Sequence, residues 1–384
     1  MLLFGVGEMR IFNIIQCANL GGMEKANLEL LSGLKERGHE IELLSLNPIE
    51  GLKPLLEERA IPAEGLAYRG RAGWRSLPQL RRYLAKVRGD ALIMTGHNLL
   101  AMLSLGDLCR NRRLLMIHFH HTGVKPAWQW RLIYRAAVAR FAAVAFPSDF
   151  IRLEAETLYP PLAKISHTVG FSIDLPQLPS VAERAQARHE LGLPLQARIV
   201  GNCGWLIPRK RFDVFLRVAR DIARGDPGAL FVVAGDGSEA ERLRSLAQEL
   251  GIAERVRWLG WQSDLTSFYR SLDLMVFNTD WDAVGRAPLE ALGAGVPVVA
   301  SALHSGLSEM LDARTYDLVF AEHDVPRLAR AALDILNHQA KGKQLVSNAR
   351  QRIGEVATLE RYVEQVCGLL GIVDGRMTAG VVSR

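Results

Sequence analysis

Residues 273–301 read DLMVFNTDWDAVGRAPLEALGAGVPVVAS, and this stretch decides the fold. Two apolar runs of strand-forming residues, at 273–277 and 296–301, enclose a polar loop and a helix. The loop holds Asp282 and Gly285, and Pro288 stands in the first helical turn, where its missing N–H costs nothing. A strand, a helix and a second strand in close succession predict a parallel βαβ unit.

The same alternation runs through the chain in two series, separated by the Pro-rich stretch SIDLPQLPS and a polar helix. The predicted strands are 10–15, 40–46, 91–95, 113–117 and 142–146, then 198–203, 229–237, 256–261, 273–277 and 296–301. We therefore predict an α/β protein with two Rossmann-like doubly wound domains, 1–180 and 181–354, that face each other across a cleft. Residues 355–384 are expected to form a helix and tail that pack back towards the first domain.

Capping signals predict several helix boundaries. A helix over Met23–Arg37 ends in a basic turn followed by Gly38, as a left-handed C′ residue requires. After residues 229–237, Ser238 and Glu241 have the spacing of a capping box, and Gly251 marks the end of that helix. The last amphipathic helix is predicted over 355–370.

Composition excludes several classes of protein. The 384 residues are 49% hydrophobic and 23% charged, which is typical of a globular chain and not of a disordered one. The apolar stretches are shorter than a bilayer span, and the start lacks the basic region and cleavage site of a signal peptide, so we expect a cytoplasmic protein. The four cysteines are isolated, so neither a disulfide framework nor a zinc site is expected.

The net charge of +6 lies entirely in the first half of the chain. Residues 59–88 hold eight basic residues and one acid, and residues 108–148 hold seven basic residues and no acid. An anionic partner is expected there, and no nucleic-acid motif accompanies the charge. One helix has the composition of a helix lying on anionic lipid, the alternative being a helix packed on its own sheet; its residues are Trp128, Trp130, Ile133 and Tyr134 with Lys125, Arg131 and Arg135.

The strand ends indicate which ligand class to expect. No G-x-G-x-x-G or G-x4-G-K-[ST] motif follows a strand, which disfavours an NAD(P) dehydrogenase and a P-loop kinase. Free amides at a helix start can hold an anion or sugar hydroxyls, and the carboxylates of Asp282 and Glu290 can accept from two vicinal hydroxyls, so this segment suits a sugar nucleotide. The alternative is that Asp282 is an ordinary loop cap and Glu290 a solvated helix residue.

These residues resemble the family-4 type of retaining glycosyltransferases with the GT-B fold. The family signature is Glu-x7-Glu followed by Ala and a Gly-containing turn, and here Asp282 and Glu290 stand at the two acidic positions. The resemblance covers nearly the whole chain. It extends through Gly21, Gly22 and Glu24, His97 and Asn98, His118, the GDG at 235–237 and the final helix.

The resemblance implies roles for individual residues. Glu290 would bind the ribose, Asp282 and the Ala283–Gly285 amides the donor sugar, and Lys210 the diphosphate. The expected catalytic residues are His118, Lys210, Asp282 and Glu290. The expected donor-binding residues are Gly21, Gly22, Arg209, Lys210, Gly235, Gly237, Trp261, Ala283, Val284, Gly285, Arg286 and Glu290. The expected acceptor-binding residues are Glu24, His97, Asn98 and His120.

The chain departs from the family pattern at two positions. Asp282 is one methylene shorter than the family's Glu, which puts the identity of the donor sugar in doubt. Trp205 stands where the family has a phosphate-binding Arg. Because an Arg fork grips two phosphate oxygens, Arg209 is expected to take over part of that role, with Arg286 as the alternative.

Two possible metal sites are set aside. Asp280-Trp281-Asp282 spells the D-x-D of a different, single-domain glycosyltransferase fold, but Asp282 already belongs to the register that leads to Glu290. His118, His120 and His121 lack a third ligand at suitable spacing. We expect no metal and no cofactor beyond the nucleotide-sugar donor.

The sequence thus predicts a metal-independent retaining glycosyltransferase. The expected substrates are a nucleotide sugar, a UDP-sugar above all, and a glycan or glycolipid acceptor of cell-envelope polysaccharide or lipopolysaccharide synthesis. Peripheral attachment at the inner face of the cytoplasmic membrane follows from the basic first half. The alternatives are a sugar-nucleotide epimerase of the same fold and a catalytically silent glycosyltransferase-like partner protein.

Overall fold

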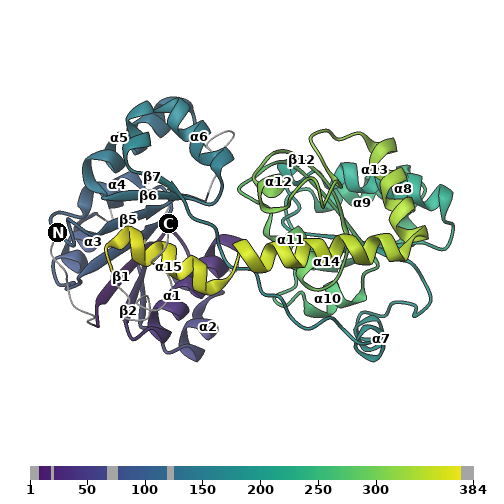
Figure 1. The fold of residues 1–384 in the computed structure, drawn as a ribbon, viewed down its shortest axis with the longest axis horizontal. Coiled ribbons are helices and arrows are strands. Elements are labelled where there is room, and N and C mark those ends of the chain that lie inside the picture. Colours follow the sequence, from purple (N-terminus) through teal and green to yellow (C-terminus); the bar gives the residue numbers. More distant parts are fainter. Residues whose placement is uncertain (1–7, 19–20, 67–76, 119–124, 373–384) are drawn as a thin grey trace, which may run out of the picture. The chain divides into compact units, whose positions relative to one another are not determined.

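The structure, a computed structural model, describes residues 8–18, 21–66, 77–118 and 125–372. The chain divides into two compact units, Met1–Ser172 with Ala357–Arg384 and Ile173–Val356, each built around its own parallel sheet (Figure 1). These bounds lie near the predicted divisions at 180 and 354.

The first unit contains a seven-stranded sheet in the order β3-β2-β1-β4-β5-β6-β7, with every neighbouring pair parallel. Its strands are β1 (Arg10–Ile15), β2 (Glu40–Ser45), β3 (Ala63–Gly65), β4 (Ala91–Thr95), β5 (Arg113–Met116), β6 (Ala143–Phe146) and β7 (Ser166–Thr168). Its helices are α1 (Gly22–Glu36), α2 (Lys53–Glu58), α3 (Leu77–Leu84), α4 (Leu99–Ser104), α5 (Ala127–Arg140), α6 (Asp149–Leu158), the 3-10 helix η2 (Pro160–Lys164) and α15 (Leu359–Leu370). The strand order reverses between β1 and β4. Doubly wound sheets bind ligands at such a reversal, outside the carboxyl ends of the strands.

The second unit contains a six-stranded parallel sheet in the order β10-β9-β8-β11-β12-β13. Its strands are β8 (Ile199–Cys203), β9 (Leu230–Ala234), β10 (Val256–Gly260), β11 (Leu274–Asp282), β12 (Val298–Ser305) and β13 (Val319–Phe320). Its helices are α7 (Val181–Glu190), α8 (Phe212–Gly225), α9 (Ala240–Glu249), α10 (Thr266–Ser271), α11 (Arg286–Gly293), α12 (Leu307–Met310), α13 (Val325–Asn337) and α14 (Gln339–Val356), with 3-10 helices η3 (Pro208–Lys210) and η4 (Ala253–Arg255). Here the order reverses between β8 and β11.

The fold class and the ten predicted strands are confirmed, and three further strands are present. β3, β7 and β13 are two or three residues long and lie at sheet edges, where a strand needs no apolar run on both faces. The helix predicted over Met23–Arg37 is confirmed as α1, with Gly38 at a φ of 90° directly after its C-cap.

The capping box predicted at Ser238 is wrong. Helix α9 begins at Ala240, its N-cap is Glu239, and no side chain caps it. Glu241, the expected partner of Ser238, instead pairs with Arg244 one turn along the helix. A complete capping box is present at α7, between Ser180 and Glu183.

The last predicted helix begins later than expected, because Thr358 interrupts it. Helix α14 ends at Val356, and the Thr358 hydroxyl accepts a hydrogen bond from the Arg361 amide at 3.2 Å to start α15. Helix α15 packs on α1, where a Cβ at Gly33 would come within 2.6 Å of Val363 Cγ2. Glycine at position 33 therefore lets the two helices of the first unit approach each other.

Asp273 ties helix α7 to the sheet of the second unit. Its Oδ1 accepts from Arg184 Nη2, and its Oδ2 accepts from Arg188 Nη2, both at 2.8 Å. The amide of Ile199, the first residue of β8, also donates to Oδ2 at 2.8 Å. The Arg188 side chain is only 8% exposed, so its charge depends on this carboxylate.

We expect Asp273→Ala to lower the free energy of unfolding by about 3 kcal/mol, because it leaves the buried Arg188 cation without a carboxylate. This is the lower end of the usual range, because Asp273 itself keeps some solvent access. Asp334→Ala is the matched control, since Asp334 pairs only with exposed partners, and it should cost less than about 1 kcal/mol. Urea titration measures both, and equal costs for the two variants would contradict the role of Asp273.

Candidate active site

The predicted donor-binding residues of the second unit follow the carboxyl ends of four adjacent strands. The segments after β8 and β11 flank the reversal of strand order; β9 is the next strand beyond β8, and β10 lies beside β9 at the edge of the sheet. In doubly wound sheets this edge is where ligands bind. The structure therefore brings together, along one edge, the predicted residues of four separate segments: Arg209 and Lys210, Gly235 and Gly237, Trp261, and Asp282–Glu290.

Basic residues 209–211 lie along strand residues 280–282. Arg209 Nη1 donates to the Trp281 carbonyl oxygen at 3.2 Å, and its guanidinium carbon lies 4.2 Å from the centre of the Trp281 ring. The Thr279 hydroxyl donates to the Arg209 carbonyl oxygen at 3.2 Å. The positively charged segment is thus fixed to the end of β11 through both its backbone and its side chains.

Asp282 forms an ion pair at this edge. Its Oδ2 pairs with Lys210 Nζ, and its Oδ1 accepts from the Ala283 amide at 2.9 Å. Burial opposes ionisation of Asp282, but Lys210, Arg209 and this amide outweigh it and hold the pKa of the carboxyl below its usual range. Asp282 is the last residue of β11 and does not lie in a loop, so the expectation of an ordinary loop cap is wrong.

Helix α11 begins at Arg286, after loop residues 283–285, and Pro288 lies in its first turn as the sequence predicted. Its N-cap is Gly285, with φ of 88°, a left-handed conformation that favours glycine. The loop before it is anchored to β12 and the turn that follows: the Ala283 carbonyl accepts from the Gly306 amide at 3.1 Å, and the Val284 carbonyl accepts from the Ser305 hydroxyl at 3.2 Å. The loop is thus fixed by its carbonyl oxygens.

Glu290 is held by two donors and is not a solvated helix residue. Arg286 Nε donates to its Oε1 at 2.6 Å, and the Tyr269 hydroxyl donates to its Oε2 at 2.9 Å. Burial, together with Cys203 and Glu290, raises the pKa of Tyr269 well above its usual value, so the phenol stays a donor. Arg286, the alternative phosphate ligand, is occupied by Glu290 in this structure.

The GDG segment has a packing role that the sequence did not reveal. Gly235 and Gly237 have φ of 151° and 156°, and a Cβ at either would collide with the carbonyl oxygen of Gly204 or Leu206. The loop after β9 also donates from the Glu239 amide to the Leu206 carbonyl at 2.9 Å. These glycines therefore allow the loops after β8 and β9 to lie against each other.

Two tryptophans stand exposed beside that loop pair. The rings of Trp205, after β8, and Trp261, after β10, have centroids 4.5 Å apart and planes inclined by 35°. Trp205 is 44% exposed and Trp261 41% exposed, although both side chains are large and apolar. An exposed aromatic pair at the binding edge of a sheet offers a stacking surface to a planar ligand group.

The predicted residues at the start of the first unit also meet at strand ends. Gly21 is the N-cap of α1, Gly22 its first residue, and a Cβ at Gly21 would collide with the Glu24 carboxylate. Cys17, which follows β1, donates through Sγ to Glu24 Oε1 at 3.3 Å. Burial raises the pKa of Glu24, which favours a protonated carboxyl there.

His97 and Asn98 follow β4, beside β1 in the same sheet. Asn98 caps α4 by accepting from the Ala101 amide at 3.0 Å, and its Nδ2 donates to Gln16 at 3.0 Å. The His97 ring lies 5.0 Å from the Trp130 ring, centre to centre. His120 and the neighbouring His121 lie outside the described residues.

His97 and His118, one an expected acceptor-binding residue and the other an expected catalytic residue, both have lowered pKa values. Burial lowers the pKa of each to about 4, helped at His97 by the charge of Lys125. Both rings are therefore neutral at pH 7. A neutral imidazole at position 118, which follows β5, can donate and accept hydrogen bonds but holds no extra proton.

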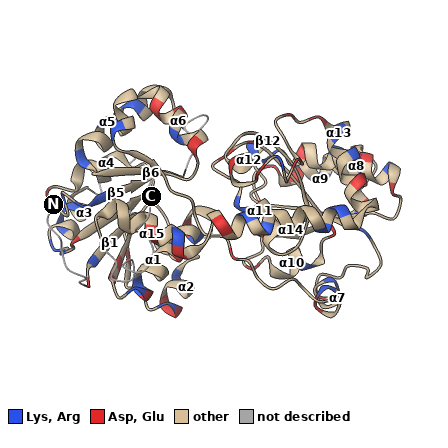
Figure 2. Ribbon diagram, in the orientation of Figure 1, with Lys and Arg blue, Asp and Glu red and all other residues tan. Residues whose placement is uncertain are grey.

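The interfacial helix predicted over residues 125–135 is wrong in part. Trp130, Ile133 and Tyr134 of α5 are buried against the first unit, so they cannot face a lipid. Trp128 and Leu132 are exposed, and basic residues recur along α5 (Figure 2). Within the described ranges, no helix has the length and apolarity needed to cross a membrane.

Both carboxylates of the D-x-D sequence have cationic partners. Asp280 pairs with Arg211 at 2.9 Å, and Asp282 pairs with Lys210. A divalent cation would have to displace these side chains. Among the residues that the structure describes, no group of three or more His, Cys, Asp or Glu side chains is placed to hold a metal.

Sequence reasoning missed three supporting residues. Tyr269 donates to Glu290, Asp280 accepts from Arg211, and His323 contacts Asp280, each across a long sequence separation. No local pattern encodes such a contact. Arg211 follows Lys210 directly in the sequence, and it pairs with Asp280 at 2.9 Å.

Comparisons with known proteins show the family of this chain. Residues 183–352 match the family model described as "Glycosyl transferases group 1", and residues 21–166 match the "Glycosyl transferase 4-like domain". An uncharacterised glycosyltransferase of Haemophilus influenzae is 21% identical over 94% of this chain and 99% of its own. The lipopolysaccharide core biosynthesis glycosyltransferase LpsD of Rhizobium meliloti is 34% identical, over 30% of this chain and 32% of its own.

A solved structure shares the fold. The Anabaena protein Alr3699/HepE, crystallised with UDP and glucose, superimposes with a TM-score of 0.81 over 95% of this chain and 100% of its own. Its sequence identity is 18%, so this likeness concerns the fold alone.

The neutral histidines give a pH prediction. Histidines of the unfolded chain bind protons near pH 6.5, whereas His97 and His118 of the folded protein bind them only near pH 4. The free energy of unfolding should therefore decrease as the pH is lowered from 6.5 to 4. Each histidine contributes a slope of up to about 1.4 kcal/mol per pH unit. We expect His97→Gln to reduce the slope measured by urea titration from pH 7 to pH 4. An unchanged slope would contradict a neutral, buried His97.

Proposed function

This chain belongs to the family-4 type of glycosyltransferases with the GT-B fold, and we propose that it transfers a sugar with retention from a nucleotide sugar to a glycan or glycolipid. One observation carries the proposal: Lys210 and Arg209 are fixed beside Asp282 at the ligand-binding edge of the second sheet. Two cations at this place suit a diphosphate, and the neighbouring carboxylates suit hydroxyl groups. The chain is a glycosyltransferase, and the substrates and stereochemistry are the proposal.

The donor is proposed to bind along the strand ends of the second unit. Lys210 and Arg209 take the diphosphate, Asp282 and the Ala283–Gly285 amides take the sugar, and Glu290 takes the ribose hydroxyls. In this structure Lys210 forms an ion pair with Asp282, and the Ala283 amide donates a hydrogen bond to it. A bound donor would share these contacts or replace them. Gly21, Gly22 and the neutral His118 of the first unit are proposed as further donor-binding residues.

The uracil of a UDP-sugar is the proposed partner of the Trp205–Trp261 pair. A pyrimidine ring stacks on an indole face, and both indoles are exposed beside the proposed diphosphate site. The similar Anabaena protein was crystallised with UDP and glucose, which supports this donor class. Trp205 would then contribute to base binding, while Arg209 replaces the family's phosphate-binding Arg.

The chemistry is proposed to be front-face substitution, without a protein nucleophile. The bond between the anomeric carbon and the β-phosphate oxygen breaks, and the acceptor oxygen bonds to the same face of that carbon. The acceptor hydroxyl proton passes to the departing phosphate oxygen. Lys210 and Arg209 stabilise the negative charge that grows on this oxygen, which is electrostatic stabilisation of the transition state.

The acceptor is proposed to bind the first unit through Glu24, His97, Asn98 and His120. The described members of this group follow β1 and β4 at the reversal of strand order. The lipopolysaccharide relative from Rhizobium supports a role in cell-envelope polysaccharide or lipopolysaccharide synthesis. We propose that the reaction needs neither metal nor cofactor, since Asp280 and Asp282 already have cationic partners.

Hydrolysis of a panel of nucleotide sugars without acceptor, in buffer with EDTA, tests this function. We expect slow release of the sugar with net retention, fastest from a UDP-sugar. An isomerised nucleotide sugar would indicate the epimerase, and absence of both turnover and nucleotide binding would indicate the silent partner protein. A requirement for Mg²⁺ would contradict metal independence.

In the same assay we expect Lys210→Met to lower kcat by about 10²–10³-fold, because one charged contact to the leaving group typically contributes about 2.7–4 kcal/mol. The Ala283 amide and Arg209 still serve Asp282, so the variant should stay folded. Lys343→Met, at an exposed position of α14, is the control and should keep normal turnover. Near-normal turnover by Lys210→Met would contradict the role of Lys210.

We propose that the exposed side of α5 docks on the anionic inner face of the cytoplasmic membrane. It presents Trp128 and Leu132 together with Arg131 and Arg135. The protein should co-sediment with phosphatidylglycerol vesicles at low salt and be released at high salt. Trp128→Ser should weaken this binding, and absence of sedimentation at low salt would contradict the proposal.

A further inference from the structure

Arg211 has a backbone conformation that is unfavourable for its residue type. It links η3 to α8 as the N-cap of that helix, and its φ of 45° and ψ of 43° are left-handed. A side chain with a Cβ seldom adopts this conformation, whereas glycine adopts it freely. Such strain persists only where the surroundings hold the residue in place, and it is typical of functional sites.

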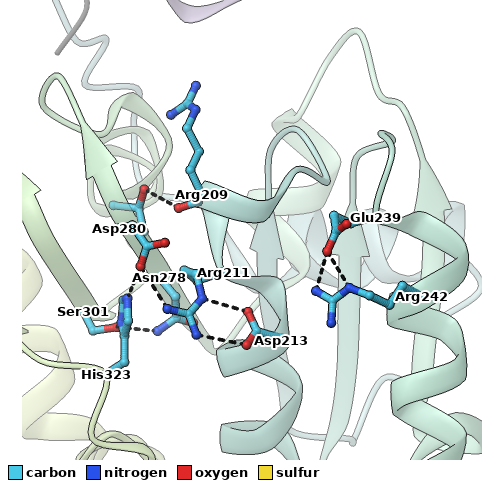
Figure 3. A network of polar contacts seen from close by, with 10 residues as sticks. Arg209, Arg211, Asp213, Glu239, Arg242, Asn278, Asp280, Ser301 and His323 are labelled. Carbon is cyan, nitrogen blue, oxygen red and sulfur yellow. Dashed lines mark hydrogen bonds and ion pairs between the residues drawn. The ribbon is translucent and has the colours of Figure 1, made fainter. Parts of the chain in front are cut away.

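Two carboxylates hold Arg211 in this conformation (Figure 3). Its Nε and Nη2 donate to the two oxygens of Asp213, at 3.0 and 3.1 Å, in a bidentate pair. Its Nη1 donates to Asp280 Oδ1 at 2.9 Å. Asp213 lies in the first turn of α8 and Asp280 near the end of β11, so one guanidinium joins the helix to the strand.

A chain of hydrogen bonds connects Asp280 to the interior of the sheet. His323 Nε2 lies 3.0 Å from Asp280 Oδ1, and His323 Nδ1 lies 2.6 Å from the Ser301 hydroxyl oxygen. Asn278 Nδ2 donates to the same hydroxyl oxygen at 2.7 Å. A carboxylate only accepts, so His323 donates from Nε2; when the ring is neutral, its Nδ1 accepts from the Ser301 hydroxyl.

This direction of the hydrogen bonds requires a neutral His323. Burial lowers the pKa of His323, with Arg211 acting in the same sense, although Asp280 and Asp213 oppose it. The order of Ser301, His323 and Asp280 resembles a hydrolase triad, but Ser301 is fully buried within the sheet. Its hydroxyl therefore cannot reach a substrate, and the chain of contacts is structural.

We infer that Arg211, Asp280 and His323 are positioning residues for the donor diphosphate. The inference rests on the proposed function of Lys210 and Arg209. Arg211 follows Lys210 directly, so the contacts that fix its backbone also fix where the Lys210 and Arg209 side chains begin. Without them, the segment would lose its tie to β11 at Asp280, and the two cations would meet the diphosphate less often in the productive geometry.

Arg211→Gly separates this role from folding, because glycine accepts the left-handed backbone without strain. We expect Arg211→Gly to leave the melting temperature nearly unchanged. Its Kd for UDP, measured by calorimetry, should be about tenfold higher, and its kcat for donor hydrolysis about tenfold lower. Arg224→Ala is the matched control, since Arg224 lies on the same helix with its side chain 72% exposed, and it should change neither value.

Two further variants test the connection to the interior. His323→Gln keeps an N–H group directed at Asp280 and should retain most of the UDP affinity, whereas His323→Phe removes it and should resemble Arg211→Gly. Asp280→Asn combined with Arg211→Gly should be no worse than the poorer single variant, because both break the same contact. A purely structural role would predict lower melting temperatures with unchanged Kd and kcat.

The outcomes distinguish this inference from the proposed function. If Arg211→Gly keeps its UDP affinity and kcat within twofold while Lys210→Met is inactive, the positioning role is wrong and the proposed site stands. If Lys210→Met is fully active, or if the wild-type protein binds none of UDP, GDP and ADP, the proposed site is wrong and the inference falls with it.

Discussion

The candidate site depends on the contact between basic residues 209–211 and strand residues 280–282. Lys210 and Arg211 each pair with a carboxylate of β11, and Arg209 lies on the ring between them. A strand at the reversal of sheet order is rigid, so it gives three flexible basic side chains fixed partners. The same contact holds the pKa of the Asp282 carboxyl below its usual range, and Arg211 is the N-cap of α8.

Much of the fold could be predicted from the sequence, because its strands are apolar and its helices have local stop signals. Gly38 ends α1 as expected. The incorrect or missing predictions concern short segments, namely a helix cap and a two-residue strand. Ser238 had the spacing of a capping residue, but Glu239 occupies the N-cap. β13 has only two residues, which is too short for any periodic signal.

The acidic residues of the site could be predicted from their spacing, but their electrostatic partners could not. Asp282 and Glu290 were found from the register of one strand and one helix. Tyr269 donates to Glu290 from a different helix, and nothing in the local sequence around Tyr269 indicates it. The neutrality of His118 follows from burial, which depends on the packing of the whole unit.

Helix α15 has a consequence for the order in which the protein matures on the ribosome. It belongs to the first unit, yet it is synthesised after the whole of the second unit, whose residues are continuous in the chain. During synthesis, the α1 surface around Gly33 therefore stays uncovered until Val363 of α15 has left the ribosome. The continuous unit can complete its core earlier, so the first half of the gene encodes the half that is finished last.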